Sequence, residues 1–394
     1  MINRRSFLQT SGAVISGSLC AKYLSDEALA STSAPQYMVP FTDPKFGTKV
    51  VKVTNPNNAV PGLGLTWGSI AIHHYSDDQA WNADQTLLRL DRGTTPKVFL
   101  DGNTYKPLFA LKAPGDMRWH RTNPDLMVIL GAKGVSLWNV RKNTVQVLNP
   151  LTGYTGANYA DKGNLSDDGN MVAVRATRAD GKPVAFAFNI ATGQKHPDID
   201  LSNQYEVSWT TISPKGTYIV MDSKTLSSDA NEHRRVFTID GKLVQTWPEY
   251  ERPGHNDFMV DSNGYEVAIG RSKSAPDAYR MVKRRLVDGN VTVISPPCYA
   301  SHTSARNLRD PGWVIATFTQ SYGNSGYWPY ANEVTAVATD GSGKVRRYAQ
   351  HNSAPNGYFT EPHGTPSPDG KKVIFESNWG NPTGPIAAYV AQIA

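Results

Sequence analysis

Three histidines recur at matching places in the C-terminal half of this 394-residue chain. His255, His302 and His363 each stand about eight residues before a short turn that leads into an apolar run. Imidazole nitrogens and thiolates are ligands that zinc prefers, and Cys298 lies just before His302. If the fold brings these four side chains together, they form a closed, zinc-type metal site. The alternative is that each histidine caps its own structural unit by hydrogen bonding. If a metal is bound, His351 is a further candidate ligand.

A second set of residues combines a tyrosine, an arginine and a pair of histidines. Tyr159 and Arg175 are 16 residues apart, a spacing that can bring both side chains to one rim of a strand–turn–strand pair. His73 and His74 are neighbours, so on a strand they face opposite sides and only one reaches a given cleft. Removing the proton next to a uronate carboxylate needs a base, a cation and an acid, which these residue types supply. The set therefore indicates β-elimination, with Arg175 on the carboxylate, and Tyr159 and one of the two histidines exchanging protons.

A loop rich in glycine and aromatic residues contains Tyr327 and Trp328. Aromatic faces stack on apolar surfaces and carry a polar edge, which suits a sugar ring. We predict that this pair binds substrate, and packing between structural units is the alternative.

These side chains can meet only if the elements that carry them surround a common centre. The chain repeats a turn followed by an apolar strand seven times, with equivalent points at Asp84, Asp125, Asp168, Lys215, Asn263, Pro311 and Asp369. Successive points are between 41 and 58 residues apart, and a period of about 40 to 50 residues is typical of propeller blades. The 33 glycines and 26 prolines supply turns, and no long helical periodicity is present. The sequence therefore predicts an all-β fold, a seven-bladed β-propeller, in which equivalent positions of adjacent blades converge.

The first thirty residues have the features of an export signal. Arg4 and Arg5 form a twin-arginine pattern, a mildly apolar stretch follows, and small residues at 28–30 suit cleavage. Cys20 is an alternative lipoprotein site, but Leu19 before it fits that reading poorly. The apolar stretch is too short for a membrane span. We predict a signal peptide over residues 1–30, a single propeller domain over 31–394, and a periplasmic or secreted protein.

The charge balance favours an anionic partner. The formal net charge is +6, which attracts anions, although it also serves solubility. No Lys/Arg run or nucleic-acid-binding signature accompanies this charge, so we expect an anionic polysaccharide and no nucleic acid. Cys298 would be the only cysteine after cleavage, and in an oxidising compartment a lone thiol is a small buried hydrophobe or a metal ligand.

Several strings resemble a known family of enzymes. They are His73–Asp84, Arg118–Trp119, Gly254–Asp257, Ser301–Asn307, Glu361–His363 and Ser377–Gly380. They resemble the seven-bladed propeller lyases that cleave ulvan, polysaccharide lyase families 24 and 25, and more distantly oligogalacturonate lyase, a propeller with a histidine-rich metal site.

The resemblance implies roles for residues already singled out. A tyrosine and an arginine at the spacing of Tyr159 and Arg175 are implicated there in catalysis and in neutralising the carboxylate. His73 fits best the position of the partner acid/base, and one bound metal, in our expectation zinc, is structural. We therefore expect a monomeric lyase that cleaves a uronate-containing, sulfated polysaccharide such as ulvan.

Two other functions stay open. One is a non-catalytic propeller of the cell envelope that binds glycans or proteins through its basic face. The other is an oligogalacturonate-type lyase that uses the metal directly to polarise the substrate carboxylate.

Overall fold

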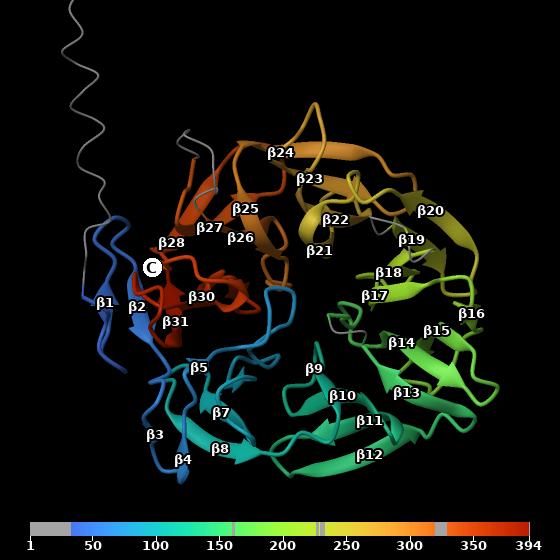
Figure 1. Cartoon of the computed structure of the whole chain (residues 1–394), viewed down its shortest axis with the longest axis horizontal. Coiled ribbons are helices and arrows are strands. Elements are labelled where there is room, and N and C mark those ends of the chain that lie inside the picture. The colour runs from blue at the N-terminus through green and yellow to red at the C-terminus, as the bar shows by residue number, and fades with distance from the viewer. Residues whose placement is uncertain (1–32, 160–161, 226–227, 229–232, 320–328, 394) are drawn as a thin grey trace, which may run out of the picture. The chain divides into compact units, whose positions relative to one another are not determined.

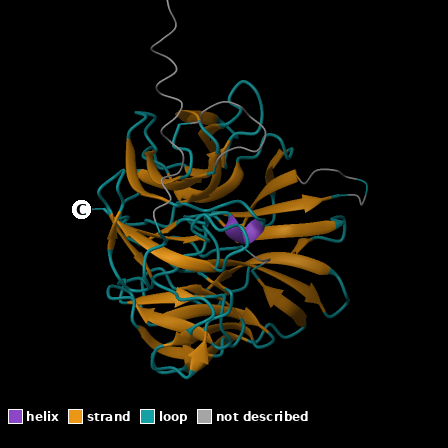
Figure 2. Ribbon diagram, turned by 60° about the vertical axis from the view of Figure 1, so that its left-hand side comes forward, coloured by secondary structure: helices purple, strands orange, loops and turns teal. Residues whose placement is uncertain are grey.

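The computed structural model describes residues 33–159, 162–225, 228, 233–319 and 329–393. The chain divides into residues 1–34 and a compact unit, Pro35–Ala394, and the fold below is that of the second unit. The elements of its described residues are strands and one short 3-10 helix, η1 (Tyr358–Thr360), purple in Figure 2. None of the helices in the described residues has the length and apolar character that a membrane crossing needs.

Seven antiparallel sheets surround a centre, which confirms the predicted seven-bladed β-propeller (Figure 1). Blade 1 contains β6 (Leu87–Leu90), β7 (Lys97–Asp101) and β8 (Pro107–Leu111). Blade 2 contains β9 (Asp116–Trp119), β10 (Leu126–Gly131), β11 (Gly134–Asn139) and β12 (Thr144–Asn149). Blade 3 contains β13 (Tyr154–Asn158), β14 (Met171–Arg178), β15 (Pro183–Asn189) and β16 (Ile199–Asp200).

The next three blades repeat this four-stranded pattern in chain order. Blade 4 contains β17 (Glu206–Ile212), β18 (Tyr218–Lys224), β19 (His233–Thr238) and β20 (Leu243–Trp247). Blade 5 contains β21 (Gly254–Val260), β22 (Glu266–Arg271), β23 (Arg280–Arg285) and β24 (Val291–Pro297). Blade 6 contains β25 (Ala300–Ser304), β26 (Trp313–Phe318), β27 (Glu333–Ala338) and β28 (Val345–Gln350).

Blade 7 closes the ring by combining both ends of the unit. Its order is β1 (Phe41–Thr42), β2 (Lys49–Lys52), β31 (Ile386–Gln392), β30 (Lys372–Ser377) and β29 (Thr365–Pro366). The early strand β2 pairs antiparallel with the last strand β31, from Lys49 opposite Gln392 to Lys52 opposite Tyr389. A parallel pairing of β5 (Ile70–Ala71) with β31 adds a second tie, and β3 (Ala59–Val60) with β4 (Leu65–Thr66) forms a separate hairpin.

The turn before β30 shows how the repeated motif builds a blade. The Ser367 hydroxyl donates to Asp369 Oδ1 over 2.7 Å and accepts a hydrogen bond from the Lys372 backbone N–H over 3.0 Å. Gly370 has a φ of +69°, and a Cβ there would lie 2.9 Å from Asp310 Oδ2 in the preceding blade's turn. Glycine therefore suits the backbone conformation of this turn, and a larger residue would also force the Asp310 side chain to shift.

Apolar side chains from adjacent sheets fill the space between blades. One cluster joins Val128 of blade 2 to Val172 and Phe186 of blade 3, and another joins Ile269 of blade 5 to Val314 of blade 6. Each such buried side chain contributes roughly 1.5–3 kcal/mol relative to its exposed state. This packing fixes each blade against the next and so holds residues far apart in sequence at shared positions near the centre.

Candidate metal centre and active site

The candidate site is built from the first strands of blades 5 and 6 and the segment that enters blade 7. These first strands lie nearest the centre of the ring in Figure 1. His255 is on β21, His302 is on β25, and Glu361 and His363 follow η1. Both strands carry a register shift at the histidine, between Gly254 and Asp257 and between Ala300 and His302. Such bulges re-aim side chains next to functional sites, and His255 accordingly has a φ of +44°.

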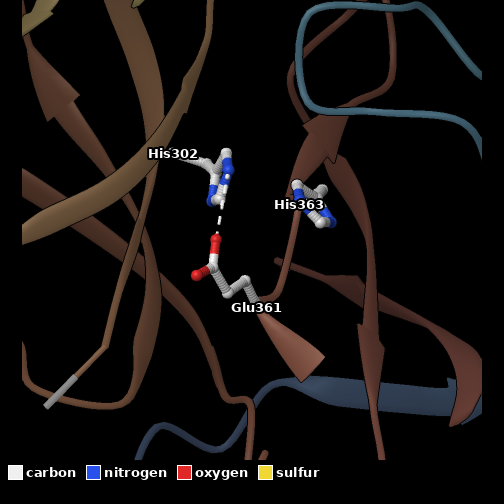
Figure 3. A group of neighbouring side chains, drawn as sticks. All are labelled: His302, Glu361 and His363. Carbon is white, nitrogen blue, oxygen red and sulfur yellow. Dashed lines mark ion pairs between the residues drawn. The ribbon is translucent and has the colours of Figure 1, made fainter. Parts of the chain in front are cut away.

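His302, Glu361 and His363 form the possible metal site of the described residues. One ligand atom from each lies within 4.8 Å of the others. Figure 3 shows the His302 ring and the Glu361 carboxylate pointing toward each other, with a 3.6 Å distance from Nε2 to Oε2. The two imidazole ring centroids are 4.2 Å apart.

The nitrogens of these two rings fit a metal ion. Both ring nitrogens of His302 and the Nε2 of His363 are buried, and in the part of the chain that the structure describes they have no hydrogen-bond partner. Buried polar atoms are satisfied in the great majority of native structures, so three orphans in one place point to a missing partner. Burial, followed by the neighbouring His363 and His255, holds the pKa of His302 well below its usual range. The ring is therefore neutral and offers a lone pair to a cation.

A buried carboxylate holds the His363 ring in place. Glu376 accepts hydrogen bonds from His363 Nδ1 and, over 3.1 Å, from the His363 backbone N–H. Burial acts to raise the pKa of Glu376, but the adjacent His363 and His73 and these hydrogen bonds keep it below its usual value. An ionised carboxylate behind a histidine is the common support of a metal-binding imidazole.

His73 belongs to this support. It is 1% exposed, its Nε2–H donates to the His363 carbonyl over 2.7 Å, and its Nδ1 lies 3.7 Å from Glu376 Oε2. A side chain that is enclosed and engaged in this way positions the ligand and does not reach a sugar. The prediction that His73 exchanges a proton with substrate is therefore wrong.

Two aromatic rings and a lysine lie beside the metal-site histidines. The rings of Tyr75 and Tyr358 are parallel, with centroids 6.4 Å apart, and each lies 4.9 Å from the His363 ring. The Tyr75 hydroxyl is 3.3 Å from Nδ1 of His255, and Lys162 Nζ lies 4.1 Å above the Tyr75 ring. Tyr358 is 42% exposed and so presents an aromatic face to solvent.

Two cavities meet at His255. The smaller one, about 330 Å³, is also lined by Arg271, Tyr299, Tyr358 and Glu361. The larger one is about 460 Å³, and its charged lining residues are Asp77, Lys162, Asp222, Arg234, Glu249, Arg252 and Lys273. Cations therefore outnumber acids around the space next to the metal site, which suits an anionic ligand.

Arg271 differs from the other cations of these walls. Its guanidinium stacks 4.0 Å from the Tyr299 ring centroid, and its buried Nη1 has no hydrogen-bond partner within the described segments. Arg234, by contrast, is engaged by Asp222 through two hydrogen bonds of 2.8 Å. In the described part of the chain no carboxylate pairs with Arg271, so its planar donor fork is available to a carboxylate of the ligand.

Cys298 does not join the metal site. It is fully buried in the apolar cluster between blades 5 and 6, and its Sγ lies 3.3 Å from the Ser295 hydroxyl. Burial raises the pKa of the Cys298 thiol, which opposes the thiolate form that a metal needs. The predicted thiolate ligand is therefore wrong, and Glu361 stands with His302 and His363 instead. His255, the other predicted ligand, is not in this group of described residues, although its ring centroid lies 4.5 Å from that of His302.

Tyr159 and Arg175 lie on different sides of their sheet. Tyr159 is fully buried against blade 2, and its hydroxyl donates to the Val128 carbonyl over 3.0 Å. Arg175 donates to the Val207 carbonyl and lines a separate cavity of about 420 Å³. Side chains alternate along a strand, and Arg175 pairs with Asn158, the residue before Tyr159. The predicted shared rim, with Tyr159 as proton-transfer group and Arg175 on the carboxylate, is therefore wrong.

The other predicted residues lie elsewhere. His74 contacts Asp78, with 3.0 Å from Nδ1 to Oδ2, and lines a third cavity of about 250 Å³. The reserve ligand His351 is satisfied on both nitrogens, by the Phe318 carbonyl and the Ser353 N–H, each over 3.0 Å. Tyr327 and Trp328 lie outside the described residues.

Sequence reasoning missed four residues of this site. Glu361 stood in a string that carried the family resemblance but received no role, although it is two residues from His363. Glu376 lies 13 residues after His363, a separation that signals pairing only once the β29–β30 hairpin register is known. Tyr75 follows the two histidines directly, and Arg271 carried no sequence signal of its own.

Comparisons with known proteins support the fold. No family model matches the chain, and no curated protein matches it. Two solved structures are similar over nearly the whole chain. One is an oligogalacturonate lyase in complex with manganese, with a TM-score of 0.61 and 14% identity. The other, from Vibrio parahaemolyticus, is also an oligogalacturonate lyase, with a TM-score of 0.59 and 12% identity.

Both alignments cover 90% of this chain and 96% of the other. At this identity the likeness shows a shared fold. It agrees with the more distant of the two resemblances seen in the sequence, while membership of the ulvan lyases stays a prediction. The chain is thus a seven-bladed propeller structurally similar to oligogalacturonate lyases, with a possible His/Glu metal site near its centre.

Proposed function

We propose that this protein is a metal-assisted lyase that cleaves uronate-containing saccharides by β-elimination. The observation that carries the proposal is the His302, Glu361 and His363 cluster, with three unpartnered buried nitrogens, beside cavities lined by cations. The similarity to two oligogalacturonate lyases supports it.

The ligand set favours a catalytic metal over a structural one. Structural zinc sites are closed by four protein ligands, whereas two imidazoles and one carboxylate leave positions open for substrate. Bound there, a divalent ion such as Mn²⁺ or Zn²⁺ would act as a Lewis acid toward the substrate carboxylate. His302, Glu361 and His363 would hold it, with Glu376 orienting His363.

Arg271 is the residue that we assign to the substrate carboxylate. Its unpartnered Nη1 and its stacking on Tyr299 leave a fixed, permanently charged fork at the cavity wall. Neutralising this carboxylate lowers the cost of the negative charge that develops when the adjacent proton leaves.

His255 is the residue that we assign as the base. Partial withdrawal from water, followed by the charges of Arg271 and Lys162, lowers its pKa to about 3, so the ring is neutral near pH 7. It can accept a proton at Nε2 when its Nδ1–H donates to the Tyr75 hydroxyl, 3.3 Å away. Tyr75 therefore positions the ring and selects the tautomer that acts as a base.

The substrate class follows from the same walls. The cations of both cavities favour an acidic saccharide, and the exposed face of Tyr358 suits stacking on a sugar ring. Oligogalacturonate and a sulfated polymer such as ulvan both meet these requirements. Export through a twin-arginine signal at residues 1–30, which lie outside the described residues, and a monomeric state remain part of the proposal.

The test is a lyase assay on a panel of acidic saccharides. Metal-stripped protein is supplied with Mn²⁺ or Zn²⁺ and incubated with oligogalacturonate, pectate, alginate and ulvan, and the ultraviolet absorbance of the unsaturated uronate is followed. We expect activity on at least one substrate, its loss on chelation, and a rise in KM for Arg271→Lys. Binding of these saccharides without any absorbance change would favour the non-catalytic propeller instead.

A matched pair of variants tests the site within the propeller. His255→Gln removes the proposed base, whereas His351→Gln changes a histidine of the same cavity whose two nitrogens are already satisfied. We expect kcat to fall by about 10²–10⁴-fold for the first and to stay within a few-fold for the second, in protein that remains folded. Equal losses in both variants would refute the assignment of His255.

A further inference from the structure

A buried carboxyl group that no step above uses lies in the wall of the larger cavity. Asp77 follows Tyr75 and Ser76 and is 2% exposed. It lines this cavity together with Tyr75, Lys162 and His255. Its Oδ1 is buried and has no hydrogen-bond partner among the described residues, while its backbone carbonyl accepts from the Asn164 side chain over 2.5 Å.

Asp257, the acid whose charge acts most strongly on Asp77, has the opposite environment. Asp257 accepts four hydrogen bonds. Two come from Arg306, at 2.8 Å each, and two come from the backbone N–H groups of Phe258, at 2.8 Å, and Ala305, at 2.7 Å. Asp257 is thus fully hydrogen-bonded. Asp77 Oδ1, by contrast, accepts no hydrogen bond from the described residues, and a buried carboxyl group without donors favours its protonated form.

The other charges around Asp77 do not reverse this result. Burial, followed by Asp257, holds the pKa of Asp77 well above its usual range, and Asp78 acts in the same direction. Lys162 and Arg118 oppose it. Arg118 is engaged by Asp116, with 3.0 Å from Nη1 to Oδ1, and Asp78 is engaged by Arg89. A neutral carboxyl group at the cavity wall is a proton donor that lines the same cavity as the proposed base.

We propose that Asp77 is a protonated carboxylic acid that donates its proton to the leaving sugar oxygen during elimination. This inference rests on the proposed lyase function and deepens it. His255 takes the proton from the carbon next to the carboxylate, and the electron pair of that bond forms the new carbon–carbon double bond. The bond to the leaving oxygen breaks, its electron pair stays on that oxygen, and the Asp77 proton neutralises it. Exchange with water returns His255 and Asp77 to their starting states.

The geometry explains why two separate groups are needed. His255 lines both cavities, whereas Asp77 lines the larger cavity and is not among the described residues that line the smaller one. A bound saccharide can place the carbon that loses its proton at His255 and its leaving unit in the larger cavity. The base then acts on that carbon, and the acid acts on the leaving oxygen. The larger cavity thereby becomes the site of the leaving unit.

The experiment compares Asp77→Asn with His255→Gln on two substrates. One is the saccharide that the wild-type protein cleaves, and the other is a uronide whose leaving oxygen carries a nitrophenyl group. We expect Asp77→Asn to lower kcat by about 10²–10⁴-fold on the saccharide but by less than about tenfold on the activated uronide, which leaves without a proton. His255→Gln loses both activities because proton removal is still required. Equal losses of Asp77→Asn on both substrates would overturn the proposal.

Infrared spectroscopy gives a readout that does not depend on turnover. Wild-type protein at neutral pH should show the carbonyl band of a protonated carboxyl group that Asp77→Asn lacks and that the exposed control Asp340→Asn retains. Since a protonated carboxyl and an amide are both neutral, Asp77→Asn should unfold at nearly the wild-type temperature. A missing band overturns the inference even in an active enzyme, whereas a wild-type protein with no lyase activity on the panel refutes the proposed function and with it this role.

Discussion

The support of the metal site by Glu376 can be tested by one substitution of nearly equal size, Glu376→Gln. The carboxylate is fully buried and accepts two hydrogen bonds from His363, one from ring Nδ1 and one from the backbone N–H. A glutamine offers one carbonyl oxygen, so its amide group must face one of these two donors. One charge-assisted hydrogen bond is lost, together with the negative charge that makes the ring a stronger ligand.

The magnitude follows from the lost bond. Hydrogen bonds to charged groups contribute about 1.5–3 kcal/mol, and removing such a support typically weakens metal binding by about 10–100-fold. These figures agree, because a tenfold change corresponds to about 1.4 kcal/mol. We therefore expect Glu376→Gln to raise the Kd for Mn²⁺ by about 10–100-fold.

The assay is calorimetric titration of metal-stripped protein with Mn²⁺ and, separately, with Zn²⁺. Glu266→Gln is the matched control, because it changes a buried glutamate of blade 5 whose Oε1 accepts from the Lys215 N–H. Circular dichroism confirms that both variants remain folded. An unchanged Kd in folded Glu376→Gln would falsify the view that His363 is a metal ligand oriented by this carboxylate.

Three further substitutions separate structural from functional residues. Cys298→Ala should retain full metal content by elemental analysis while losing about 0.5–3 kcal/mol of stability to urea. A loss of metal from this variant would show that the Cys298 thiolate is a ligand. Tyr159→Phe should keep lyase activity and lose about 1 kcal/mol, the value of its hydrogen bond to Val128, and an inactive but folded variant would contradict this. His351 has its pKa lowered by burial to about 4, whereas the unfolded chain binds a proton below about pH 6.5. Because the unfolded state then binds more protons, wild-type stability should fall by about 3 kcal/mol as pH drops through this window. In His351→Asn this part of the pH dependence of the unfolding free energy should be absent in urea titrations. The same dependence on pH in this variant as in the wild type would refute the assignment to His351.

Local sequence chemistry determined the fold of this protein. Ser367, Asp369 and Gly370 form a turn from short-range hydrogen bonds and one positive φ, and Ser166, Asp168 and Gly169 form the same kind of turn in blade 3. Repetition at a nearly constant period then implies a ring, because each sheet must bury its faces against the next. The matching places of His302 and His363 in adjacent repeats likewise predicted that their side chains converge.

The exact membership of the site depended on tertiary structure. Whether a strand residue faces a cavity or the neighbouring blade is set by register, and a shift of one residue reverses it. Tyr159 therefore faces the core, whereas the preceding residue, Asn158, pairs with Arg175. The bulges at His255 and His302 could not be predicted from the spacing of residues in the sequence.

The acidic partners of the site were hidden for a related reason. Glu361 contributes a possible ligand and Glu376 a support only because the chain entering blade 7 brings them against histidines of other segments. Sequence determines which residues can form turns and strands, since those preferences are local. Which buried nitrogen or carboxyl group is left without a partner depends on long-range packing, and that is where the proposed chemistry of this protein arises.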